Sequence, residues 1–118
     1  MKISEIKNIL NAEVICGEEL LDRDVTTAFG SDLMSDVLAF AKEQSVLLTG
    51  LVNPQAIRTA LMLDMPCVVF VRAKKLSSDV ISLAKESGVV VLSTEFRMFE
   101  ACGKLYAKGL KGSGETDE

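Results

Sequence analysis

Three short, uninterrupted apolar runs recur at nearly equal spacing along the second half of the chain. They are Val46-Leu47-Leu48, Val68-Val69-Phe70-Val71 and Val89-Val90-Val91-Leu92. A strand with one wet face alternates polar and apolar residues, whereas a continuous apolar run is typical of a strand covered on both faces. Each run leads into a polar loop and then a helical pattern. This order predicts consecutive βα units that form a parallel sheet with right-handed crossovers.

Capping residues delimit the helices predicted after these runs. Asn53 followed by Pro54 starts one helix, which we expect to extend to about Leu63. Ser77 or Ser78 caps the next helix, and Gly88 ends it. Thr94 with Glu95 begins the last helix, in which one face carries Phe96, Phe99, Cys102 and Tyr106.

The first third of the chain has weaker signals. A helix over 4–10 capped by Ser4, a strand over 13–16 and a second strand over 25–29 are expected, with a turn at Gly17 between the strands. Gly30 closes the second strand, and Ser31 or Asp32 caps a helix behind it. The predicted buried face of that helix comprises Leu33, Met34, Val37, Leu38 and Ala41.

The length of 118 residues suits one domain and is too short for two ordinary ones. We assign residues 1–108 to a single α/β domain. Residues 109–118 (GLKGSGETDE) are polar and contain glycine, and we expect them to form a flexible tail.

Composition excludes several functional classes. The formal charge of −4 argues against broad binding to nucleic acid. Histidine is absent, and the three cysteines, Cys16, Cys67 and Cys102, form no CxxC pair. Neither a zinc site nor a disulfide framework is indicated, so we expect no cofactor and interpret the cysteines as structural thiols in a reducing cytoplasm. The N-terminus has no signal-peptide pattern, and no apolar run is long enough to span a membrane.

Candidate ligand-binding residues follow the three predicted parallel strands. Ligands of such sheets bind at the carboxyl ends of the strands, near helix N-termini. The loops offer hydroxyl, backbone N–H and cationic groups that suit a phosphate or carboxylate. The alternative is that the hydroxyls only cap turns and the cations are solvated. No glycine-rich nucleotide loop is present. The candidates are Thr49, Gly50, Asn53, Arg72, Lys74, Ser77, Ser93 and Thr94.

Two groups of charged residues have structural interpretations that we favour over functional ones. Asp22 and Arg23 can form a partner surface or a charge relay across a dimer, or else an ordinary turn with local ion pairs. Asp32 and Asp36 lie one helical turn apart, and we interpret them as solubility charges rather than an acid–base pair. Nothing supplies an activated nucleophile or a tuned base, so an enzyme is the weakest hypothesis.

The ordered series of short motifs resembles the DRTGG domain family. The resemblance is carried by 9–14 (ILNAEV), Gly17, 22–25 (DRDV), 48–50 (LTG), 82–89 (SLAKESGV) and 92–94 (LST), and it covers residues 3–108. It implies a three-layer α/β/α fold like the N-terminal domain of HPr kinase, with a mainly parallel sheet. Family members usually accompany enzymes as accessory domains, and no catalytic residue is established for them.

This sequence departs from the family at one loop. Many relatives have Thr-Gly-Gly after the Val68–Val71 strand, where this chain has Val71-Arg72-Ala73. A glycine pair permits positive φ and close approach to a ligand, so the change places a side chain where relatives have none. The favoured function is a non-catalytic regulatory domain that senses a small anion or nucleotide. The alternative is a homodimeric interaction module that docks on a redox enzyme of the iron hydrogenase type.

Overall fold

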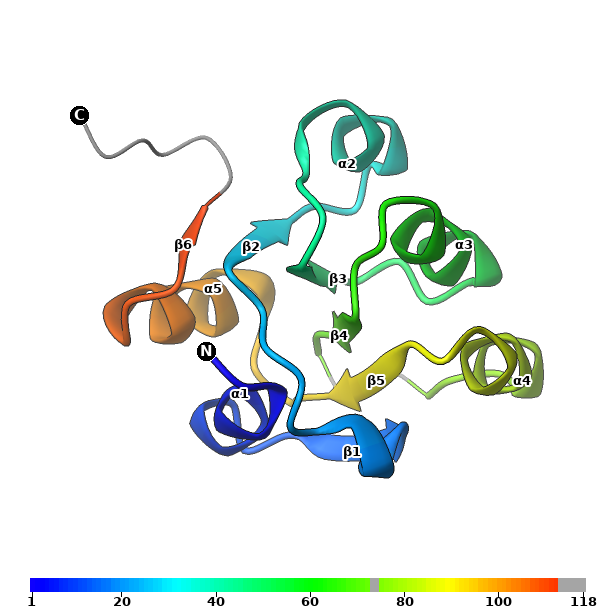
Figure 1. Cartoon of the computed structure of the whole chain (residues 1–118), viewed down its shortest axis with the longest axis horizontal. Coiled ribbons are helices and arrows are strands. Elements are labelled where there is room, and N and C mark those ends of the chain that lie inside the picture. Colours follow the sequence, from blue (N-terminus) through cyan, green and yellow to red (C-terminus); the bar gives the residue numbers. More distant parts are fainter. Residues whose placement is uncertain (73–74, 113–118) are drawn as a thin grey trace.

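A computed structural model describes residues 1–72 and 75–112. Within them, six strands form one sheet in the order β1-β5-β4-β3-β2-β6, and every neighbouring pair is parallel except β1 and β5 (Figure 1). The strands are β1 (Glu13–Cys16), β2 (Thr27–Gly30), β3 (Ser45–Thr49), β4 (Cys67–Phe70), β5 (Val90–Ser93) and β6 (Lys111–Gly112). The expected mainly parallel α/β fold is confirmed.

Helices cover both faces of the sheet, which gives the predicted three layers. On one side lie α1 (Ile3–Ile9) and α5 (Met98–Ala107). On the other side lie α2 (Met34–Phe40), α3 (Pro54–Met62) and α4 (Ser78–Ser87) (Figure 1). A 3₁₀ turn, η1 (Glu18–Leu20), follows β1.

The central strands divide their side chains between two hydrophobic cores. Val46 and Leu48 of β3 pack toward α1 and α5, while Leu47 between them packs toward α2, α3 and α4. All three are fully buried. The same alternation holds in β4 and β5, so the continuous apolar runs reflect a sheet covered on both faces.

Helix starts were predicted with mixed success. Asn53 and Ser77 cap α3 and α4 as expected, and Gly88 ends α4 with φ +73°. The cap assigned to Ser4 is wrong, because α1 already begins at Ile3 and the Glu5 carboxylate accepts a hydrogen bond from the Lys2 N–H at 3.0 Å. The start assigned to Thr94 is also wrong, because α5 begins at Met98.

The apolar faces predicted for two helices are only partly buried. In α2, Met34 and Val37 are buried, whereas Leu33 and Leu38 are exposed. In α5 the core residues are Ala101 and Leu105, whereas Phe99 is 85% exposed and Tyr106 is half exposed. These two predictions fail because the core contacts only a narrow stripe of each helix.

The second strand and the tail differ in extent from the prediction. Strand β2 covers Thr27–Gly30 rather than 25–29, since the Val25 N–H instead donates to the Met1 carbonyl. Part of the expected tail is ordered, because Leu110 is buried and Lys111–Gly112 pair with β2. Residues 113–118 of that tail lie outside the described residues, and the domain boundary stays a prediction.

Candidate functional site

The carboxyl ends of the parallel strands bring four loops together. Each of β2, β3, β4 and β5 ends at this edge of the sheet, and the loop after each contacts the next through hydrogen bonds. The Ser31 N–H donates to the Leu48 carbonyl and the Val71 N–H to the Thr49 carbonyl. The Thr94 N–H donates to the Phe70 carbonyl. The predicted loops therefore form one continuous surface, which we call the carboxyl edge.

The peptide of Gly50 lies at the centre of the carboxyl edge. Its N–H donates to Oδ1 of Asp32 at 2.6 Å, and the Thr49 hydroxyl donates to the same oxygen at 3.2 Å. The Thr49 Oγ1 in turn accepts the Leu51 N–H at 3.1 Å. The Asp32 carboxylate thus already accepts from the Thr49 hydroxyl and the Gly50 N–H, two of the groups predicted to bind an anion.

The side chain of Arg72 covers Gly50 from the next loop. Its Nη2 donates to the Gly50 carbonyl at 3.4 Å, and its guanidinium fills the space that a Cβ on residue 50 would need. The Arg72 backbone is left-handed, with φ +69°, and its N–H donates to the Phe96 carbonyl at 2.9 Å. The backbone geometry that glycine favours is therefore kept at residue 72, at a cost of about 1 kcal/mol in a non-glycine residue.

Asp32 is the member of this cluster that sequence reasoning missed. It neither caps α2, whose N-cap is Leu33, nor acts as a mere solubility charge. Ser31 does not cap α2 either, since its hydroxyl accepts the Leu33 N–H. Its position in the sequence could have indicated this role, because Asp32 follows the carboxyl end of β2. The prediction considered only the loops after the three apolar runs and so left out β2.

The remaining predicted hydroxyl and amide groups serve the fold. Asn53 Oδ1 accepts the Gln55 N–H at 2.8 Å, and Ser77 Oγ accepts the Val80 N–H at 3.4 Å. The buried Thr94 hydroxyl donates to the Leu10 carbonyl at 2.8 Å, on the α1 side of the sheet. Ser93 is half-buried at the end of β5. These contacts favour the capping interpretation for Asn53, Ser77 and Thr94.

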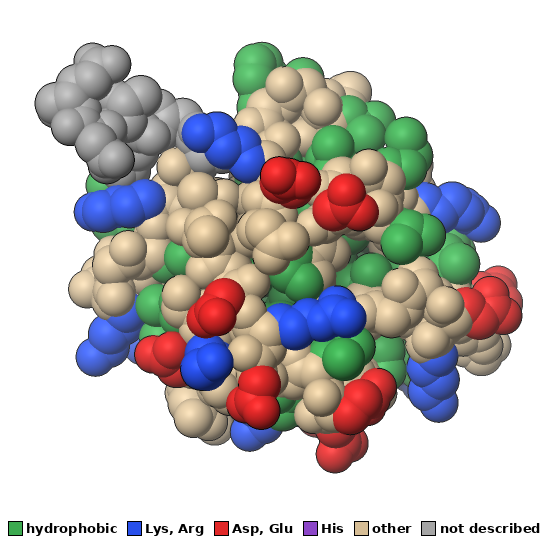
Figure 2. Space-filling view, in the orientation of Figure 1, with side chains coloured by type: hydrophobic (Ala, Val, Ile, Leu, Met, Phe, Trp, Pro, Cys, Tyr) green, Lys and Arg blue, Asp and Glu red, His purple; other side chains and the backbone are tan. Residues whose placement is uncertain are grey.

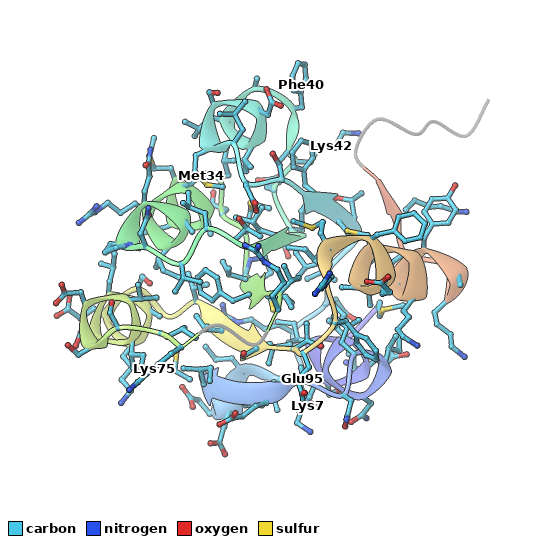
Figure 3. All side chains as sticks on the ribbon, turned by 180° about the vertical axis from the view of Figure 1, so that it is seen from behind. Lys7, Met34, Phe40, Lys42, Lys75 and Glu95 are labelled. Carbon is cyan, nitrogen blue, oxygen red and sulfur yellow. The ribbon has the colours of Figure 1, made fainter. Side chains whose placement is uncertain are left out.

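The cations on and beside the predicted loops are spread apart. Arg72 is exposed beside Gly50, and Arg97 is exposed at the start of α5. Lys75 projects into solvent on the α4 side of the molecule (Figure 3). Lys74 lies outside the described residues. Within the described part of the carboxyl edge, Arg72 is the cation that contacts the Gly50 loop.

Asp22 and Arg23 lie at the opposite edge, where the parallel strands begin. The carbonyl of Asp22 accepts a hydrogen bond from Lys2 Nζ at 3.1 Å, and that of Arg23 accepts the Ile3 N–H at 2.9 Å. Arg23 lines a groove of about 620 Å³ there, together with the acidic residues Asp24, Glu43 and Asp64. We call this surface the amino edge.

The thiols have the properties of core residues. Burial raises the pKa of Cys67, which is fully buried at the start of β4, and also raises the pKa of Cys16 and Cys102. A raised pKa keeps a thiol protonated and unreactive. Over residues 1–72 and 75–112, no cluster of three or more side chains suits a metal ion. No helix in the same residues is long and apolar enough to cross a membrane.

Comparison with known proteins identifies the family. The sequence pattern of the DRTGG domain matches residues 5–107, nearly the whole chain. The chain belongs to the DRTGG domain family. No curated protein matches it by sequence.

Among solved structures, the DRTGG fold recurs in the regulatory region of Clostridium perfringens pyrophosphatase. That structure contains CBS and DRTGG domains in complex with the activator diadenosine tetraphosphate. It superposes with a TM-score of 0.73 at 18% identity, over 88% of this chain and 45% of the other. The DRTGG chain described here therefore spans less than half of that protein chain, and the similarity establishes the shared fold.

Proposed function

We propose that this DRTGG domain is a non-catalytic regulatory module that senses a small anion at its carboxyl edge. The observation that carries the proposal is the exposed Arg72 guanidinium held over the Gly50 peptide by a left-handed backbone. A non-glycine residue in this conformation is uncommon, and such residues concentrate at ligand sites. A guanidinium is the group best suited to bidentate contact with a phosphate or carboxylate.

The carboxylate of Asp32 competes with any anion that binds at Gly50. It accepts the Gly50 N–H and the Thr49 hydroxyl, so an incoming phosphate oxygen that uses these donors replaces Asp32. Ligand binding then frees the loop that precedes α2. Such a change couples the anion to the position of a helix, which is what a sensing domain requires.

A polyphosphate or nucleotide is the ligand class that we test first. The similar pyrophosphatase regulatory region was solved with diadenosine tetraphosphate, which supports phosphate-rich probes for this chain. Cytoplasmic location, which follows from the free thiols, and a role beside a larger redox enzyme, which follows from the family resemblance, are further proposals.

A thermal-shift titration with phosphate, acetyl phosphate, ATP, diadenosine tetraphosphate and small carboxylates at fixed ionic strength tests the proposal. A ligand at 100 times its dissociation constant stabilises the fold by about 2.7 kcal/mol. We expect a shift with at least one phosphate compound that is lost in Arg72→Gly, since glycine suits the backbone at φ +69°. The matched control Arg23→Ala removes an arginine from the amino edge and keeps the shift. Equal shifts in Arg72→Gly and the parent protein refute the site.

Self-association as a homodimer is a second proposed property, and one specific observation favours it. The outer faces of α2 and α3 expose five large apolar side chains: Leu33, Leu38, Phe40, Leu61 and Met62.

A further inference from the structure

The outer surface of α2 and α3 differs from that of the third helix in the same layer. The exposed positions of α4 are Ser78, Asp79, Ser82, Lys85 and Glu86, a normal solvated face. Hydrophobic side chains instead gather over α2 and the adjoining part of α3 (Figure 2). Phe40 projects from α2 away from the sheet, while Met34 lies between α2 and α3 (Figure 3). The outer faces of α2 and α3 are therefore more apolar than expected for helix faces that contact only water.

The exposed apolar residues are large and strongly exposed. Leu33, Phe40 and Met62 are 57%, 66% and 71% exposed. Leu38 and Leu61 are 43% and 47% exposed. Leu33, Phe40, Leu61 and Met62 together present on the order of 400 Å² of apolar surface, which is the size of a functional patch on a monomer. A standard interface covers about 800 Å² per partner with an apolar centre and a polar rim, so this surface supplies such a centre.

Each of the two helices adds one charge of opposite sign to the apolar stripe. In α2, Asp36 shares its helical face with Phe40, four residues later, and follows the N-cap residue Leu33 by three. In α3, Arg58 shares its face with Leu61 and Met62 at the same spacings. Asp36 and Arg58 are both exposed, and no ion pair joins them within the described part of the chain.

A stripe with one acid and one base on adjacent helices is complementary to itself. In a twofold contact, residue i of one copy meets residue j of the other, and the reverse contact forms as well. Placing α2 of one copy against α3 of another pairs Asp36 with Arg58 twice and covers both apolar stripes. A partner other than a second copy would have to supply the same alternation of charge.

We propose that the α2–α3 surface, defined by Leu33, Asp36, Phe40, Arg58, Leu61 and Met62, is the interface of a twofold homodimer. This assignment rests on the proposed homodimer and specifies its surface. It leaves the carboxyl edge of each copy open, because Arg72 and Gly50 lie on loops at the ends of the strands and not on the outer faces of α2 and α3.

Sedimentation velocity over a micromolar concentration series tests the interface with charge-swap variants. We expect a dimer whose dissociation constant rises about tenfold or more in Asp36→Lys and in Arg58→Glu, because each places like charges opposite each other. The double variant Asp36→Lys with Arg58→Glu restores the parent value to within about threefold, because the inverted pair forms again.

Apolar substitutions give an independent test with a matched control. Met62→Lys removes an apolar contact and is expected to raise the dissociation constant about 30-fold. Phe99→Lys makes the same kind of change at an 85% exposed residue of α5, and Lys85→Glu reverses a charge on α4; both should leave the dimer intact. Circular dichroism verifies that every variant is folded.

The outcomes separate the surface from the dimer. A parent protein that stays monomeric up to millimolar concentration overturns both. A parent dimer that withstands Met62→Lys and the charge swaps, or that dissociates with Phe99→Lys, overturns the surface and leaves homodimerisation standing. Anion binding at the carboxyl edge is measured separately, by the thermal-shift titration of the parent protein and Arg72→Gly.

Discussion

The two edges of the sheet are built in different ways. At the carboxyl edge, side chains connect the loops: Asp32 accepts the Gly50 N–H, and Arg72 donates to the Gly50 carbonyl. At the amino edge the ties are spread over several residues: the Gln44 N–H donates to the Asp64 carbonyl at 3.2 Å, the Val90 N–H donates to the Pro66 carbonyl at 2.9 Å, and the hydroxyls of Thr27 and Ser45 share a hydrogen bond. Two charged side chains therefore converge on one residue, Gly50, at the carboxyl edge.

A groove nevertheless lies at the amino edge, and its charge argues against an anion there. The groove of about 620 Å³ is lined by Asp24, Glu43 and Asp64, against one cation, Arg23. Three carboxylates repel a phosphate, whereas at the carboxyl edge the Arg72 guanidinium attracts one from beside the Gly50 carbonyl, with the Asp32 carboxylate at the Gly50 N–H. The groove thus lies at the amino edge, whereas the cation suited to an anion lies at the carboxyl edge. The charge of a site decides which class of ligand it binds, so we place the anion at the carboxyl edge.

The largest expected contrast between the edges is in stability. Asp32→Ala leaves the buried Gly50 N–H without its acceptor and should lower the free energy of unfolding by about 2 kcal/mol. Asp24→Ala, the same change on the exposed groove wall, should stay within about 0.5 kcal/mol of the parent. Urea denaturation of both variants measures the difference. Equal losses would mean that the two edges are not distinct in construction.

A smaller effect is expected from crowding Gly50. Gly50→Ala introduces a methyl group into the space of the Arg72 guanidinium, which has to swing away. The expected loss is about 1 kcal/mol, and it should vanish in an Arg72→Gly background, where the guanidinium is absent. A double-mutant cycle by urea denaturation measures this coupling. A full loss in both backgrounds would show that another neighbour restricts Gly50.

The smallest expected effect is a pH dependence that arises at the amino ends of the strands. Burial raises the folded-state pKa of the Cys67 thiol above its value of about 8.5 in an unfolded chain. The resulting stabilisation is complete below about pH 8.5 and declines above it, because only the unfolded chain then ionises. Cys67→Ala should flatten the loss of stability between about pH 8.5 and 10. An unchanged slope would assign the loss to other groups.

The fold was largely predictable because each buried central strand is a continuous apolar run in the sequence. The apolar runs around Val46, Val68 and Val89 became β3, β4 and β5, and their helices followed from Asn53, Ser77 and Gly88. The antiparallel pairing of β1 was not predictable, since a four-residue strand carries no signal of direction. Strand β6 was missed because Lys111–Gly112 has no strand-like side chains and is held by pairing with β2.

The site was predictable only in part, for reasons of tertiary structure. The loops after β3, β4 and β5 were foreseen, but the contact of Asp32 with Gly50 joins residues from different βα units. The same limit applies to the outer faces of α2 and α5, where periodicity predicted burial for Leu38 and Phe99 that the narrow core contact does not provide. Periodicity shows which face is apolar, but not what covers it.

The most direct test of anion sensing at the carboxyl edge is a titration followed by amide NMR. Adding the phosphate compound that stabilises the protein most should shift the Gly50 and Arg72 amide resonances first, because the ligand replaces Asp32 at the Gly50 N–H. The amides of Gln44, Asp64 and Gly88 at the amino edge should remain unchanged. Shifts confined to those three amides, with Gly50 and Arg72 unmoved, would contradict the assignment and place the anion in the groove.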